Sequence, residues 1–185
     1  MKTISLLFLV LLLASCGESI EEFNCFIGIE VQHLLTNDSN KVWVKTETRI
    51  DSEQLANGCD DSLAYIFTTY STRVYPGNIL YILFNPSSCQ RDEFCEQYPM
   101  VCMAQELLCE ADTTINCDSI PQNLFFAGTW EIPEQINDDD PVNEIFINFP
   151  GDTSRYGINH ITSKNLELVH TEGDTEIFEK FILIE

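Results

Sequence analysis

The sequence predicts an all-β fold of eight short antiparallel strands, forming a barrel or a sandwich, with a cysteine-rich and partly helical insert. Runs of β-branched and aromatic residues are separated by turn residues along most of the chain. Several runs alternate apolar with polar side chains, as half-buried antiparallel strands do, and tight turns separate the last four. The predicted strands are residues 42–50, 62–71, 79–85, 124–132, 144–149, 156–161, 166–171 and 176–184.

Alternation within three of these strands predicts which side chains face the interior. In the first strand, Val44 and Thr46 lie on one face and Lys45 on the other. The fifth and seventh strands alternate in the same way, and Phe67 is expected opposite them. The residues predicted to line the interior are Val44, Thr46, Phe67, Ile145, Ile147, Leu166 and Leu168. They predict either an apolar ligand cavity or a packed core in which they contact one another.

The N-terminus has the features of a bacterial lipoprotein signal. Lys2 precedes an apolar run over residues 4–13, which is shorter than the about 20 residues that cross a bilayer as a helix. Residues 13–16, Leu-Ala-Ser-Cys, resemble a lipobox. We expect cleavage of residues 1–15, lipid attachment at Cys16, and a tether with an N-terminal strap over residues 16–32. An ordinary signal peptide with a nearby cysteine is the alternative.

The insert, residues 86–123, breaks the strand pattern. Residues 100–111 are rich in helix-forming residues, and Pro99 precedes them near a position that proline favours at a helix start. We therefore expect one or two short helices between the third and fourth strands.

Six cysteines are predicted to form disulfides, because a secreted chain reaches an oxidising compartment. They are Cys59, Cys89, Cys95, Cys102, Cys109 and Cys117. Cys59–Cys89 is the first expected bond, since both residues lie at ends of adjacent strands, and the insert cysteines should pair among themselves and with Cys117. In one straight helix Cys95 and Cys102 would lie about 10.5 Å apart, which is too far for a disulfide. A break at Pro99 would remove that obstacle. A zinc site is the alternative, although the short knuckle spacing is missing.

Acidic residues far outnumber basic ones, and the formal net charge is −21. This charge argues against nucleic acid as a partner and against binding flat to an anionic membrane, and it favours solubility. The acidic residues directly after Cys16 resemble surface-export signals of Bacteroidota lipoproteins, while a solvated tether explains them equally well. The length fits a single domain.

Several short motifs together resemble the small lipocalin-like lipoproteins of Bacteroidota. The motifs are Leu34-Leu35, Lys41-Val42-Trp43, Gly58-Cys59-Asp60-Asp61, Gly128-Thr129-Trp130-Glu131-Ile132 and Ile161-Thr162-Ser163-Lys164-Asn165-Leu166-Glu167-Leu168. The resemblance implies an eight-stranded antiparallel up-and-down barrel over residues 33–185, with residues 86–123 inserted, and a binding role. It implies no catalytic residues.

The individual polar and aromatic residues are expected to have structural roles rather than catalytic or ligand-binding ones. The sequence contains no catalytic, phosphate-binding or metal-binding motif of known type, so we expect no enzymatic activity, metal or cofactor. His160 and His170 fall in predicted strands, where a hydrogen-bonded structural role is commoner than ligand contact. Trp43 and Trp130 are expected to pack at the barrel ends, with ligand stacking as the alternative. The acidic run 137–140 is expected to form a solvated turn rather than a calcium site.

The leading functional hypothesis is a lipid-anchored protein of the cell envelope, expected at the outer membrane, that binds a small hydrophobic or amphipathic ligand. The alternative is an accessory subunit that docks onto an envelope protein complex through its cysteine-rich insert. Fold class alone does not separate the two, because a barrel of eight strands is either filled by side chains or holds one ligand.

Overall fold

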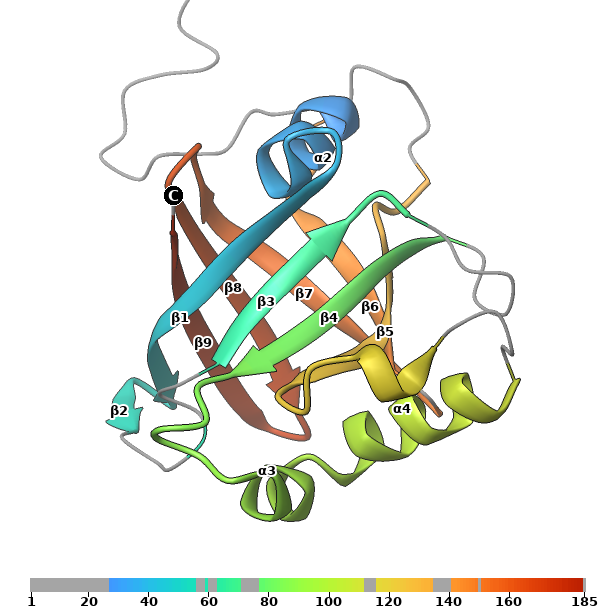
Figure 1. The fold of residues 1–185 in the computed structure, drawn as a ribbon. Coiled ribbons are helices and arrows are strands. Elements are labelled where there is room, and N and C mark those ends of the chain that lie inside the picture. Colours follow the sequence, from blue (N-terminus) through green and yellow to red (C-terminus); the bar gives the residue numbers. More distant parts are fainter. Residues whose placement is uncertain are drawn as a thin grey trace, which may run out of the picture.

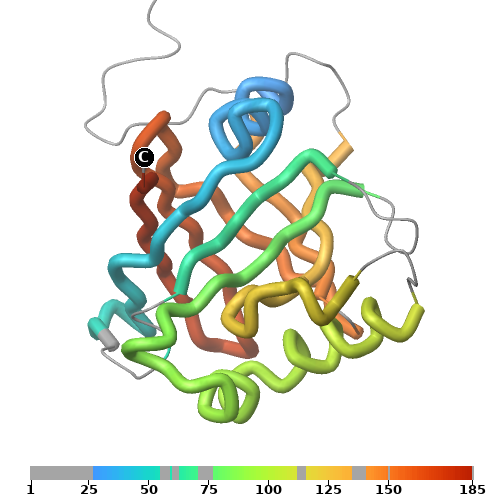
Figure 2. The backbone as a smooth tube through the Cα atoms, in the orientation of Figure 1, coloured from blue at the N-terminus to red at the C-terminus, as the bar shows by residue number. Residues whose placement is uncertain are grey.

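The computed structural model describes residues 27–55, 59, 63–70, 77–111, 116–134, 141–149 and 151–184. The predicted signal peptide, Cys16, Cys25 and the acidic run 137–140 lie outside these residues. Within them the chain forms a closed β-barrel, with one helix over one end and two further helices near the other (Figure 1). The backbone trace runs from strand to neighbouring strand around the barrel (Figure 2).

Eight strands follow one another around the barrel in sequence order, each antiparallel to its neighbours. They are β1 (Asn40–Ile50), β3 (Leu63–Thr68), β4 (Asn78–Phe84), β5 (Leu124–Glu131), β6 (Glu144–Phe149), β7 (Asp152–Ile161), β8 (Asn165–Glu172) and β9 (Thr175–Leu183). All eight predicted strands are confirmed. Because β1 also pairs with β9, the sheet closes and the sandwich alternative is excluded. Strand β2 (Glu53–Leu55), a short strand that pairs with the end of β1, was not predicted.

Helix α2 (Gly28–Thr36) closes one end of the barrel (Figure 1). Its side chains Val31 and Leu35 are fully buried in the core. Trp43 Nε1 donates a hydrogen bond to the carbonyl oxygen of Leu35 at 3.0 Å, and Trp130 Nε1 donates to the carbonyl oxygen of Thr68 at 3.0 Å. Both tryptophans are therefore packed and hydrogen-bonded at this end, as expected.

A β-bulge in β1 changes which of its residues face the interior. The register with β9 shifts just after Lys45, so Thr46 is the extra residue. Trp43 and Lys45 are buried before the bulge and Thr48 is buried after it, whereas Val44 is half-buried and Thr46 is exposed. The prediction that Val44 and Thr46 line the interior is therefore wrong, because it assumed an uninterrupted alternation along the strand.

The insert folds into α3 (Arg91–Gln97), α4 (Pro99–Ala111) and the short 3-10 helix η2 (Cys117–Ser119). Three disulfides join Cys59 to Cys89, Cys95 to Cys102, and Cys109 to Cys117. This pattern confirms the bond expected first and the pairing within the insert. The helical path breaks at Tyr98, directly before Pro99, which brings the Cα atoms of Cys95 and Cys102 to 5.7 Å.

Helix α4 packs against the outside of the barrel. Ala104 and Leu108 contact Ile79 and Phe126 in a small apolar cluster. Gln105 Oε1 accepts a hydrogen bond of 2.7 Å from the backbone N–H of Phe126, next to the point where the register between β4 and β5 shifts. These contacts hold the middle of α4 against the barrel.

Candidate ligand-binding site

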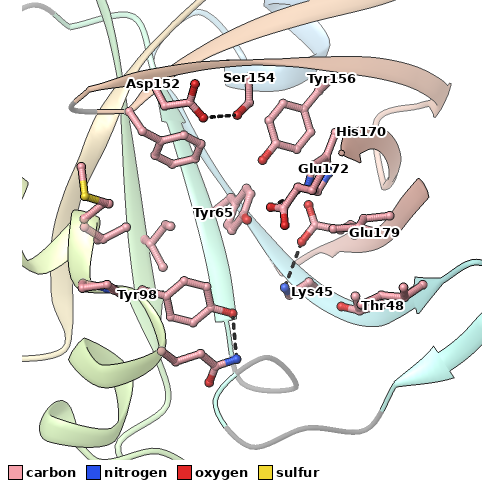
Figure 3. A pocket seen from close by; sticks show the side chains of 18 residues that line it. Lys45, Thr48, Tyr65, Tyr98, Asp152, Ser154, Tyr156, His170, Glu172 and Glu179 are labelled. Carbon is pink, nitrogen blue, oxygen red and sulfur yellow. Dashed lines mark hydrogen bonds and ion pairs between the residues drawn. The ribbon is translucent and has the colours of Figure 1, made fainter. Parts of the chain in front are cut away.

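A cavity of about 460 Å³ lies at the end of the barrel opposite α2. The barrel strands and the junction of α3 with α4 form its walls (Figure 3). From the barrel come, among others, Lys45, Thr48, Tyr65, Tyr156, His170 and Glu179, and from the insert come Gln97, Tyr98, Pro99, Met100 and Val101.

None of the seven residues predicted to line a ligand cavity is among those that line this one. Phe67, Ile145, Ile147, Leu166 and Leu168 are fully buried and belong to the apolar core. The same core cluster contains the large buried side chains of Trp43, Trp130 and Phe181. These five predicted residues therefore belong to the packed core of the barrel, and other side chains line the cavity.

The Lys45–Glu179 ion pair lies in the cavity wall. Lys45 Nζ donates a hydrogen bond of 2.9 Å to Glu179 Oε1, and the two side chains are only 3% and 5% exposed. The bulge after Lys45 turns this side chain inward, and Glu179 faces it from β9. A buried ion pair is weak evidence for stability, because removing two charges from water costs free energy that their attraction only partly returns. Its presence in a cavity wall makes a role in recognition worth testing.

Tyr156 and His170 form the adjacent part of the wall, with ring centroids 4.4 Å apart. Burial, together with the carboxylates of Glu179, Glu172 and Asp152, raises the pKa of the Tyr156 phenol. Tyr156 therefore remains a neutral hydrogen-bonding group at physiological pH. His170 Nε2 lies 3.6 Å from Glu172 Oε1.

Two polar atoms of this wall are buried without a hydrogen-bond partner in the part of the chain that the structure describes. They are His170 Nδ1 and Glu179 Oε2. Buried polar atoms in native proteins are nearly always paired, so each exception calls for an explanation. Both residues line the cavity (Figure 3), so a bound molecule can supply the missing partners once the two side chains turn these buried atoms toward it.

The insert forms the opposite wall. Gln97 Nε2 donates a hydrogen bond of 3.3 Å to Tyr98 Oη, and Pro99, Met100 and Val101 add apolar surface. The Cys95–Cys102 disulfide spans the break that presents Tyr98 to the cavity. The cysteine-rich insert is therefore part of the site, which the sequence did not indicate.

Strand periodicity contains a signal for the missed barrel residues. His170 and Glu172 continue the alternation that places Leu166 and Leu168 on the inner face, and Glu179 lies between Ile177 and Phe181 in the same alternation. A histidine or glutamate on an otherwise apolar strand face is a reason to expect a polar site in the barrel.

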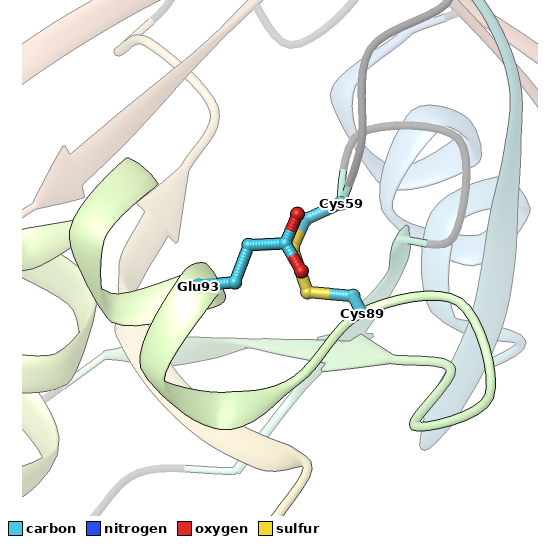
Figure 4. Close-up of side chains that lie close together, drawn as sticks. All are labelled: Cys59, Cys89 and Glu93. Carbon is cyan, nitrogen blue, oxygen red and sulfur yellow. A yellow bond between two sulfur atoms is a disulfide. The ribbon is translucent and has the colours of Figure 1, made fainter.

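A second cluster consists of Cys59, Cys89 and Glu93, whose ligand-type atoms lie within 4.8 Å of one another (Figure 4). Cys59 and Cys89 form a disulfide, and metal binding by cysteine requires free thiolates. The cluster therefore serves as a cross-link between the barrel and the insert.

No helix in the described part of the chain is both long and apolar enough to cross a membrane.

Comparison of the chain with family models, with curated proteins and with solved structures gives no significant match. The described residues form an eight-stranded antiparallel closed barrel, compatible with the lipocalin-like fold that the sequence motifs implied. The cavity and its walls are therefore the features of this barrel that point to a function.

Proposed function

We propose that this chain is a lipid-anchored envelope protein whose barrel binds one small amphipathic molecule in the cavity, without changing it chemically. The observation that carries the proposal is the pair of buried atoms on the cavity wall, His170 Nδ1 and Glu179 Oε2, that lack a partner among the described residues. An unpaired buried polar atom costs about 1–3 kcal/mol. A ligand that pairs with these atoms gains affinity from removing that cost.

The size and composition of the cavity also support binding. Its volume of about 460 Å³ falls within the range of about 300–1,000 Å³ typical of small-molecule sites, which combine apolar walls with a few polar groups. Here Ile82, Val101 and Ile177 supply apolar surface, and Lys45 and Glu179 supply the polar groups. An amphipathic molecule matches both parts.

A blocking substitution tests the binding role. Ile177→Trp places a large side chain into the cavity, whereas Ile182→Trp makes the same change on the outer face of the same strand, where Ile182 is 40% exposed. Native mass spectrometry of the purified protein should show a co-purified small molecule in the parent chain and in Ile182→Trp, and its loss in Ile177→Trp. Equal retention in both variants would contradict binding in this cavity.

The lipid anchor is proposed from the sequence around Cys16. Cells that express the chain and receive a fatty-acid analogue should label it, and fractionation should recover it with the outer membrane. Cys16→Ala should abolish labelling and release the chain from the membrane. Cys25→Ala is the matched control and should change neither. Unchanged labelling of Cys16→Ala would reject the anchor.

An accessory subunit is the second candidate, and one feature of the insert favours it. Met100, Met103 and Leu107 are each more than 40% exposed on α4, and their spacing places them along one side of the helix. If this stripe docks onto an envelope complex, Met103→Glu and Leu107→Glu should shift the chain to its monomeric position in native electrophoresis of envelope extracts. Ile29→Glu, at an exposed position on α2, should not.

A further inference from the structure

Resting on the proposed binding role, we infer that the cavity selects a ligand with a cationic, hydrogen-bond-donating head group, such as a protonated amine, on an apolar body. The side chains of Tyr156, His170, Glu172 and Glu179 converge on one part of the cavity (Figure 3). This part is where the head group would bind.

The charge balance of the lining is negative. Asp152, Glu172 and Glu179 contribute carboxylates, and Lys45 is the only lysine or arginine among the described lining residues. Lys45 is paired with Glu179, and the remaining basic group of the described lining is His170, whose Nε2 lies 3.6 Å from Glu172 Oε1 and adds a positive charge only when it is protonated. With a neutral His170 the lining carries an excess of negative charge from Asp152 and Glu172. An anionic head group, such as that of a fatty acid, would be repelled by this excess, whereas a cation would be attracted.

The unpaired oxygen of Glu179 calls for a hydrogen-bond donor on the ligand. Glu179 Oε1 accepts the hydrogen bond from Lys45, and Oε2 is buried without a partner among the described residues. An ionised carboxylate oxygen can only accept hydrogen bonds, so the group that satisfies it must be a donor. An ammonium group donates up to three hydrogen bonds and also carries the charge that Asp152 and Glu172 favour.

The Lys45 ammonium does not exclude a second cation. Its charge is compensated at 2.9 Å by Glu179 Oε1, and a ligand ammonium would bind to the other oxygen of the same carboxylate. The rings of Tyr65, Tyr98 and Tyr156 also line the cavity, and aromatic faces attract cations. A neutral alcohol could donate a hydrogen bond to Glu179 Oε2. It would gain no attraction from the carboxylates of Asp152 and Glu172, which lie at the exposed rim of the cavity.

The apolar body of the ligand would lie against Ile82, Met100, Val101 and Ile177. Removal of this surface from water contributes affinity that does not depend on the head group. Compounds with one body and different head groups therefore separate the contribution of charge from that of apolar burial.

Octylamine, octanol and octanoate form such a series, and their binding to the mature protein can be measured by calorimetry and by NMR shifts of cavity residues. Octylamine should bind about three- to tenfold more tightly than octanol, and octanoate most weakly. The advantage of octylamine should shrink as salt is added, because ions screen the rim carboxylates.

Substitutions test which residues cause the preference for octylamine. Asp152→Asn combined with Glu172→Gln should weaken octylamine binding about two- to tenfold and leave octanol unchanged. Glu176→Gln, which removes an exposed carboxylate outside the cavity lining, should change neither. Glu179→Gln leaves Lys45 without its counter-charge and should shift the preference toward octanoate. The rim variants keep the test decisive if Glu179→Gln fails to fold.

The possible results separate the two proposals. If octanol or octanoate binds as tightly as octylamine, and Ile177→Trp abolishes that binding, the binding role stands and the cationic head group is rejected. If the rim variants leave octylamine binding unchanged, the head-group assignment is likewise rejected. If none of the three compounds binds in a way that Ile177→Trp blocks, the binding role itself fails.

Discussion

Glu179 Oε1 accepts a hydrogen bond of 2.9 Å from Lys45 Nζ, although the two residues are 134 positions apart in the sequence. The contact joins the strands at which the barrel closes, β1 and β9. It also leaves Glu179 Oε2 on the cavity wall without a partner in the described part of the chain. The pair thus links closure of the barrel to the polarity of its cavity.

Removing one partner of this pair should destabilise the protein strongly. Lys45→Met leaves the buried carboxylate of Glu179 unpaired and should lower the free energy of unfolding by about 3–5 kcal/mol. Lys45→Met combined with Glu179→Leu should recover most of this loss, since no buried charge is left. Lys180→Met, which breaks the more exposed Lys180–Glu167 pair, is the control and should cost about 1 kcal/mol or less. Urea unfolding measures all three. A double variant no more stable than Lys45→Met would contradict the argument.

Tyr156 should make the stability fall at alkaline pH. Burial and nearby carboxylates raise its pKa in the folded state above the ordinary value of 10.0. The stabilising contribution of the neutral phenol is therefore fully present below about pH 10, the pKa of the unfolded chain, and is lost as pH rises from there toward the folded pKa. Tyr156→Phe should show a shallower decline in urea-unfolding free energy above pH 10 than the parent chain.

A phenolate absorbance titration provides the control for this prediction. A hydrogen bond between Ser39 and Tyr70, and one that Asn40 donates to the Tyr70 hydroxyl, lower the pKa of this exposed phenol. Tyr70→Phe should therefore remove the part of the absorbance change that occurs at the lower pH values. Tyr156→Phe should remove the part of the absorbance change that occurs at the highest pH values, where the protein unfolds. Identical alkaline profiles for the parent chain and Tyr156→Phe would refute the assignment.

The strand order and the cross-links could be predicted from the sequence, because both depend on local patterns. Alternation and turn residues identified the eight barrel strands. The rule that a break at Pro99 would permit Cys95 to bond Cys102 holds in the structure. Each of these inferences needs only nearby residues and a fixed geometry.

The cavity could not be predicted in the same way, because its position depends on relations between distant elements. The bulge at Thr46 changes which side chains of β1 face the barrel interior, and Lys45 is one of those that face inward. No turn residue marks this bulge in the sequence. The predicted lining contains no residue of the insert, yet Tyr98 and Met100 form a wall of the site. Such contacts are decided by tertiary packing, which overrides local periodicity.

The hydrogen bond between Gln105 and Phe126 should anchor the insert to the barrel. Gln105→Leu leaves the buried N–H of Phe126 without its acceptor and should cost about 1–3 kcal/mol in unfolding free energy. Hydrogen exchange at the Phe126 amide should become faster. Glu106→Leu, at an exposed position on the same helix, is the control and should change neither quantity. Unaltered exchange in Gln105→Leu would show that the bond is unimportant.

The two disulfides near the cavity should differ in their effects on stability and on binding. Cys59–Cys89 closes a loop of 30 residues and Cys95–Cys102 one of 7. Replacing the first pair with alanine should cost about 3.6 kcal/mol and replacing the second about 2.4 kcal/mol, by loop-closure entropy. Octylamine affinity should follow the opposite order, because Cys95–Cys102 holds the break that carries Tyr98. Equal affinity losses in the two double variants would argue against a role for that bond in shaping the cavity.

Gly128 lies where the backbones of the paired strands β5 and β6 approach closely, and replacing it should destabilise the protein. A Cβ atom at this position would lie 2.1 Å from the backbone oxygen of Asn148 and 3.3 Å from the Cα atom of Phe149. Both atoms belong to the backbone of β6, so the strands must separate to admit a methyl group, and Gly128→Ala should lower unfolding free energy by about 1–3 kcal/mol or more.

Gly157, on β7, provides a matched control for Gly128. A Cβ atom there would meet the backbone oxygen of Val169 at 3.6 Å, which is ordinary contact. Gly157→Ala should therefore be neutral, or stabilising by about 0.4–1 kcal/mol, because alanine restricts the unfolded chain more than glycine does. Thermal unfolding followed by circular dichroism measures both variants. Since Phe149 ends β6 at the cavity, separation of β5 from β6 should also weaken octylamine binding in Gly128→Ala and leave it intact in Gly157→Ala. Equal melting temperatures for the two variants would show that the close approach of β5 and β6 does not constrain this barrel.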